Sequence, residues 1–133
     1  MDAFLLLAGA ISLVAAAIHG AGGEVWVVRR LTPETLPPTR IGGPRMTRTM
    51  VHVTWHETTV AFLTTGGALI AAGSVLEGDA AQGVGVAAAV AATGFALVAL
   101  GIGMGTQRPR ALLSHPGPIV LASAAAFAWL GAL

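Results

Sequence analysis

The amino-acid sequence predicts an all-α, transmembrane four-helix bundle, and three observations carry that prediction. The chain has 133 residues, of which 55% are hydrophobic and only 10% are charged, whereas a soluble domain carries about 25% charged residues. Its apolar residues gather in four long runs. We find no segments of about ten alternating residues, which a membrane barrel would require. A chain so poor in charge cannot cover a water-facing surface, so we expect the lipid bilayer to be its main partner.

The four apolar runs predict four helices in one domain that covers residues 1–133. About 20 apolar residues are needed to cross the hydrocarbon core of a bilayer. The last run is short, and Pro118 suits the first turn of its helix. The helices are expected at about 3–28, 49–73, 81–104 and 118–133.

The connections between these runs are rich in turn-forming residues. The first, 29–48, contains four prolines and an adjacent pair of glycines, so we predict a loop. The second is a tight polar link around Glu77 and Asp79. The third, 105–117, again combines proline, glycine and arginine.

The arginines predict the orientation of the helices. All seven basic residues are arginines, and they lie in or beside the first and third connections. Cytoplasmic loops carry an excess of basic residues. We therefore expect loop 29–48 and the third connection to be cytoplasmic, and both termini to lie outside.

Charge and cysteine content exclude several classes of function. A net charge of +1 predicts no nucleic-acid partner, and the absence of cysteine excludes disulfides, thiolate metal sites and cysteine nucleophiles.

Ionisable residues concentrate near the predicted cytoplasmic end of the bundle. His19 and Glu24 follow the core of the first helix, His52 and His56 lie in the first turns of the second, and His115 precedes the fourth. Such residues are costly inside a bilayer, which favours a functional reason for their presence. We take all five as candidate metal ligands and the four histidines as candidate cofactor-binding residues.

The spacing of two histidines favours a metal ion. His52 and His56 are four residues apart, so they lie about 40° round the helix and about 6 Å along it. Both imidazoles then share one face and can share one ion. His19 is expected at a similar depth, and the glycines that follow it could kink the helix and turn Glu24 toward the bundle axis.

The residues leave three chemistries open. Imidazoles with a carboxylate suit zinc, iron or copper. Haem b is the second option, clamped by histidines from two helices. A proton relay through titrating histidines is the third. Glu57 points about 100° away from His56, so it is expected either to support the ligands or to face solvent.

A structural interpretation competes with each of these. The histidines could simply cap a helix end, and the three tryptophans suit an aromatic belt, although Trp55 could also wall the histidine pocket. Faces of small residues predict tight helix packing. The alternative function is therefore a non-catalytic accessory subunit of a larger membrane complex, or a homo-oligomer. A transporter is less favoured, because repeated broken helices are absent.

Three short motifs resemble a group of uncharacterised small bacterial four-span integral membrane proteins. The motifs are IHGAGGEVWVVRRL from residue 18, WHETT from residue 55 and HPGP from residue 115. The resemblance covers the whole chain and implies a multi-pass protein of the bacterial inner (plasma) membrane, but it supplies no activity or cofactor and does not mark His52. It marks His19, Gly23, Glu24, Trp55, His56, Thr58, His115 and Pro116.

The sequence therefore predicts a small inner-membrane protein with a cytoplasmic-side His/Glu cluster. We expect that cluster to bind a transition metal or haem, with a redox role as one use of it. Whether the protein is an enzyme stays open at this stage.

Overall fold

The computed structural model of the chain describes residues 1–37, 39–40, 42–106 and 116–133, with the backbone alone at 103–106. The described residues form helices and connections, with no strand among them, which confirms the all-α class. A π-helix and two 3-10 turns, Val28–Arg30 and Pro33–Thr35, accompany the α-helices. The elements of the chain are α1 (Ala3–Ala17), the π-helix (Ile18–Gly22), α2 (Gly23–Trp26), α3 (Gly43–Ser74), α4 (Gly78–Thr106) and α6 (Gly117–Ala132).

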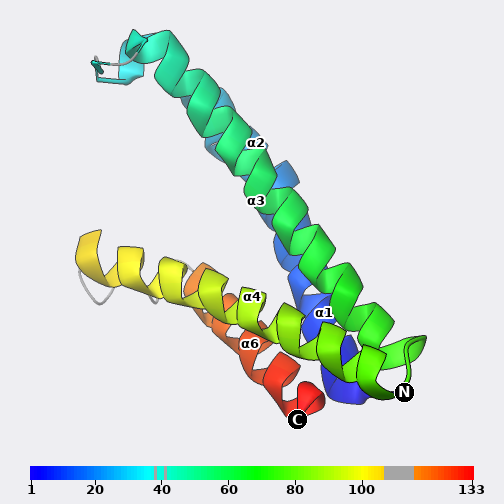
Figure 1. Cartoon of the computed structure of the whole chain (residues 1–133). Helices are drawn as coiled ribbons and strands as arrows, with labels where there is room; N and C mark the ends of the chain where they lie inside the picture. Colours follow the sequence, from blue (N-terminus) through cyan, green and yellow to red (C-terminus); the bar gives the residue numbers. More distant parts are fainter. Residues whose placement is uncertain (38, 41, 107–115) are drawn as a thin grey trace.

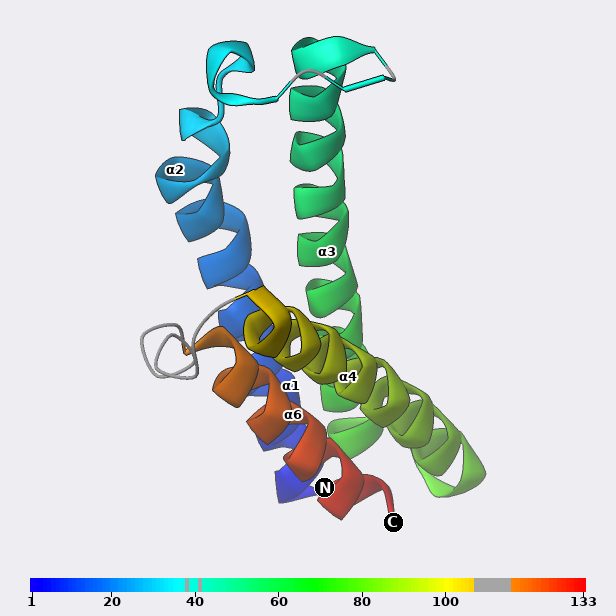
Figure 2. The same cartoon turned by 90° about the vertical axis from the view of Figure 1, so that its left-hand side faces the viewer.

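The helices form two pairs that meet at one end of the molecule. Figure 1 shows α1 and α2 running alongside α3, and α4 running alongside α6. Both chain termini lie at the end where the pairs meet, and from there the pairs diverge (Figures 1 and 2). Contacts between α1 and α6 and between α3 and α4 join the pairs. The result is a V rather than four parallel rods.

The apolar core lies at the closed end of the V. It is made largely of alanine, which lets helix backbones approach closely. A Cβ added to Gly9 of α1 would lie 2.9 Å from the carbonyl oxygen of Gly66 in α3. Asp2 fastens the same end, because its Oδ1 accepts the Leu5 N–H (2.9 Å) and its own N–H donates to the Gly73 carbonyl (2.8 Å). The core residues are Leu5, Ala8, Leu69, Ala72, Ala88, Ala89, Ala128 and Ala132.

The helix bounds differ from expectation mainly in the first connection. We expected a loop over 29–48, but α3 begins at Gly43, so Arg45 and Arg48 lie in the helix. Gly42 adopts a left-handed φ of 73°, which reverses the chain, and Pro44 suits the first turn that follows. The other bounds shift less: α4 begins at Gly78 rather than at 81.

Two helical segments are long and apolar enough to cross a membrane. They are Ala3–Arg30 and Gly78–Ile102. The shorter helix α6 is also apolar. Helix α3 does not qualify by composition, because arginines, histidines and threonines occupy its first half. Many large apolar side chains are nevertheless exposed along the helices, which is the surface that lipid would cover.

Candidate metal centre

An irregular turn at the end of α1 delivers the acidic residue of the site. Residues Ile18–Gly22 form a π-helix, a rare element that is frequent at functional sites. The expected kink at the glycines therefore takes the form of a widened turn. A Cβ on Gly20 would lie 2.7 Å from Thr59 Cγ2, and one on Gly23 would enter the Trp55 indole. Because Gly20 and Gly23 have no side chain, the backbone of the turn lies directly against α3.

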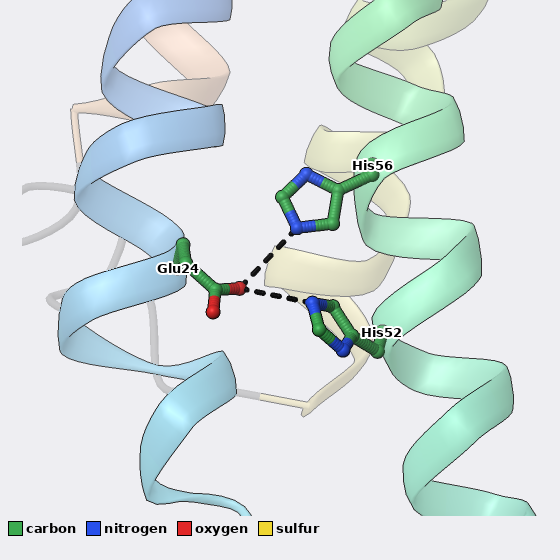
Figure 3. Close-up of side chains that lie close together, drawn as sticks. All are labelled: Glu24, His52 and His56. Atoms are coloured by element: carbon green, nitrogen blue, oxygen red, sulfur yellow. Dashed lines mark hydrogen bonds and ion pairs between the residues drawn. The ribbon is translucent and has the colours of Figure 1, made fainter.

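Three ionisable side chains converge just beyond this turn. Glu24 of α2 points across to His52 and His56 of α3 (Figure 3). Glu24 Oε2 lies 3.3 Å from Nε2 of each histidine. The two imidazole centroids are 5.0 Å apart and their planes are tilted by 49°. One ligand atom from each residue lies within 4.8 Å of the other two.

The donor set fits a transition-metal ion. Bonds of about 2.0–2.1 Å in tetrahedral geometry place neighbouring ligand atoms roughly 3.4 Å apart. The two carboxylate–imidazole distances of 3.3 Å are close to that value. Two histidines and one carboxylate also leave coordination positions for water or substrate, as in catalytic zinc and non-haem iron(II) sites. The two imidazole nitrogens lie within 4.8 Å of each other, so an ion held by all three residues would draw the two histidine side chains closer together.

Arg29 positions the carboxylate of Glu24. Its Nε donates to Glu24 Oε1 at 3.2 Å, so one oxygen is held by the guanidinium while the other faces the histidines. The Glu24 side chain is only 19% exposed, whereas that of Arg29 is 69% exposed. Partners that orient a metal ligand in this way tune its affinity for the ion.

The same contacts describe a hydrogen-bonded cluster when no ion is present. An Nε2–H of His56 can donate to the carboxylate of Glu24. To bind a metal, each Nε2 must offer its lone pair instead, with any imidazole proton on Nδ1. Both forms use the same three residues, and metal analysis separates them.

His19 lies outside this three-residue group. Its Nδ1 is 2.9 Å from Thr59 Oγ1, and its ring stacks on Trp55 with centroids 4.5 Å apart. Its backbone carbonyl accepts the Trp55 Nε1–H at 2.8 Å. Trp55 therefore walls His19, and its indole also lies against Gly23, the residue before Glu24.

The remaining predicted site residues fall into two cases. His115 lies outside the described residues. Glu57 is exposed and is not part of the metal-ligand group. Of the five predicted ligands, the structure brings together Glu24, His52 and His56. Sequence reasoning missed the role of Arg29, which we assigned to topology alone, because an i, i+5 contact is not expected on a regular α-helix.

Comparisons of the chain with protein-family models, with curated proteins and with solved structures found no match. The chemistry of the site must therefore be argued from its own geometry.

Proposed function

We propose that this protein is a multi-pass protein of the bacterial inner membrane that binds one transition-metal ion through Glu24, His52 and His56. The observation that carries the proposal is the convergence of three ligand atoms from two neighbouring helices within 4.8 Å of one another. Zinc and iron(II) suit this ligand set best. His19, His115 and haem b belong to the wider prediction, and the absorption spectrum in the test below detects haem b.

Four crossings explain the fold and the charge pattern together. Two helical segments qualify as spans by themselves. Helix α3 packs along α1 and is joined to α4 by a connection of only a few residues, so it is carried across with them. Both termini lie at one end of the molecule, as an even number of crossings requires (Figure 1). The arginine-rich connections then face the cytoplasm, with the metal centre on the same side.

The coordination positions that Glu24, His52 and His56 leave open on a bound ion indicate the chemistry of the proposed centre. A bound ion would supply Lewis-acid or redox chemistry at those positions. The chain's own residues hold the ion and orient the carboxylate. The half-exposed imidazoles of His52 and His56 leave the ion accessible from the aqueous side. An accessory subunit without chemistry of its own would not need accessible positions of this kind.

Metal analysis of the purified full-length chain tests the proposal. The protein is extracted in mild detergent, and its zinc, iron and copper are measured beside an absorption spectrum. We expect one ion per chain in the wild type and in Glu57→Gln, whose carboxylate lies next to His56 in sequence but outside the group. We expect little bound metal in His52→Ala and in His56→Ala.

The other outcomes of this experiment overturn the proposal in distinct ways. A Soret band would identify haem instead of a mononuclear ion. Unchanged metal content in both histidine variants would place the ion elsewhere. A colourless, metal-free wild type would favour the accessory-subunit or homo-oligomer alternative.

A further inference from the structure

A large cavity separates the two helix pairs. It has a volume of about 950 Å³ and is lined by residues of α1, the π-helix, α3, α4 and α6. Residues of α1 and α3 in its wall come from one helix pair, and residues of α4 and α6 come from the other. Pockets for small molecules typically have volumes of about 300–1,000 Å³. The cavity is thus large enough for a ligand of considerable size.

The lining selects a neutral ligand. Among the described residues that line the cavity there is no arginine, lysine, aspartate or glutamate. Glu24 and Arg29 are not part of the wall. A phosphate or carboxylate headgroup would therefore enter an uncompensated apolar site, which is costly. Most of the wall is alanine, glycine and larger aliphatic side chains, which suit a hydrocarbon tail.

Aromatic rings form a continuous series of contacts along the wall. Trp55 stacks on His19, and His19 meets the edge of Phe62 with centroids 5.5 Å apart. Phe62 of α3 in turn meets Phe95 of α4 at 4.9 Å, which joins the two helix pairs. All four residues line the cavity. Such surfaces favour a flat, ring-shaped group.

One polar side chain offers a directed hydrogen bond within this aromatic series. His19 Nδ1 is engaged by Thr59 Oγ1, and no hydrogen bond joins Nε2 to another residue in the described part of the chain. A neutral imidazole with one nitrogen engaged can still donate or accept at the other. Thr58 also lines the cavity, and its hydroxyl donates to the Thr54 carbonyl, so its oxygen can still accept.

We propose that this cavity binds a neutral, lipid-soluble molecule with a flat ring headgroup and an apolar tail, the chemical class of membrane quinones, with the headgroup hydrogen-bonded to His19 Nε2. The aromatic series receives the ring, and the aliphatic wall receives the tail. This assignment gives His19 a role that does not depend on the metal ion.

Binding of decylubiquinone to the full-length chain in lipid nanodiscs tests this assignment. Quenching of tryptophan fluorescence by the quinone ring reports binding of decylubiquinone. The probe n-decylbenzene has a ring and tail but no polar headgroup atoms and does not quench, so its binding is measured by competition against decylubiquinone. We expect decylubiquinone to bind the wild type at least about tenfold more tightly than n-decylbenzene, since one hydrogen bond corresponds to roughly that factor. His19→Phe keeps a ring on Trp55 but should remove this preference.

A matched pair of glycine variants tests the position of the ligand. Gly94 of α4 lines the cavity, and Gly83 of the same helix does not; a Cβ added to either meets nothing within 4 Å. Gly94→Leu should weaken decylubiquinone binding by roughly tenfold or more because its side chain occupies ligand volume. Gly83→Leu should bind like the wild type. Both variants should retain the wild-type metal content.

The remaining results overturn the assignment. Equal binding of both probes, unaffected by His19→Phe, would show a lipid-chain site without headgroup recognition. Equal weakening by Gly94→Leu and Gly83→Leu, or by neither, would place the quinone outside this cavity. Because metal content is measured on the same samples, loss of the metal centre is distinguished from loss of the cavity ligand.

Discussion

The two helix pairs share a construction but differ in chemistry. In each pair a tryptophan on the second helix donates a hydrogen bond to the first: Trp55 Nε1 to the His19 carbonyl at 2.8 Å, and Trp129 Nε1 to Thr93 Oγ1 at 3.0 Å. The α1–α3 pair carries the ionisable cluster. The α4–α6 pair has Asp79 as the single charged residue within the helix bounds.

The difference shows how a small helical protein can host polar chemistry without weakening its core. The second pair is packed mainly through alanine, and its tryptophan donates to a side-chain hydroxyl, that of Thr93. In the first pair the tryptophan donates to the backbone carbonyl of His19 in the π-helix, which also accepts the Gly23 N–H. Among the described residues, irregular backbone, glycine and tryptophan thus occur together only where the ionisable residues are held. Four predictions test this difference between the pairs.

Metal binding should stabilise the first pair by the largest amount. At a zinc concentration about 100 times Kd, a single site adds about 2.7 kcal/mol to the free energy of unfolding. We expect this gain in the wild type and in Asp79→Asn, and little of it in Glu24→Gln. Detergent-solubilised protein is first stripped with a chelator and then unfolded with SDS, with and without zinc. An equal gain in Glu24→Gln would remove this residue from the site.

A methyl group should distinguish the glycines of the two pairs. In Gly23→Ala the new methyl meets the Trp55 indole, so we expect a loss of about 2 kcal/mol in the free energy of unfolding. In Gly94→Ala it meets nothing within 4 Å, and helix propensity should raise stability by up to about 1 kcal/mol. The same SDS titration measures both. Similar losses in the two variants would mean that the pairs are packed alike.

Removal of each tryptophan donor should have a smaller effect. Trp55→Phe and Trp129→Phe each lose one hydrogen bond, which corresponds to about 1 kcal/mol in the free energy of unfolding. Only Trp55→Phe should also weaken metal binding, because Trp55 lies against Gly23, beside Glu24. Zinc titration of both variants checks this. A change in metal affinity on Trp129→Phe would show that the two pairs are coupled.

The smallest effect is expected at the exposed arginine. Arg29→Ala removes the contact with Glu24 Oε1, and exposed ion pairs contribute little to stability. Metal affinity should fall by no more than about tenfold, the low end for groups that orient a ligand. The neighbouring variant Arg30→Ala controls for lost charge and should bind zinc as the wild type does. A loss shared by both variants would point to long-range electrostatics.

Local patterns in the sequence predicted much of the helical content and part of the site. Apolar runs located the helices, and the spacing of His52 and His56 placed their side chains on one face of α3. Glu24 was predicted through the glycines that precede it. These features depend on residues close together in the chain, where periodicity and turn chemistry act directly.

Features that depend on contacts between helices could not be predicted from these local sequence patterns. The π-helix forms where glycines meet the Trp55 indole and Thr59, and these contacts join residues on opposite sides of the first connection. The sequence assigned His19 to the metal from its expected depth alone, and it gave no information on the orientation of the ring. The divergence of the pairs, and with it the cavity, follows from small residues being buried chiefly at one end.

The π-helix also has a consequence for the angular register of the first segment. Each such turn holds about one residue more than an α-turn, so every position beyond it is rotated by about 100°. Leu5, Ala8 and Ala16 follow one helical register and face the core. Glu24 lies beyond the π-turn, and its register is shifted by that rotation when it faces the histidines. Deleting the exposed Ala21 would remove the surplus residue, so that a regular α-helix could form while Leu5, Ala8 and Glu24 kept the directions they face now. One extra residue thus allows two different helical registers to occur in one continuous helical segment.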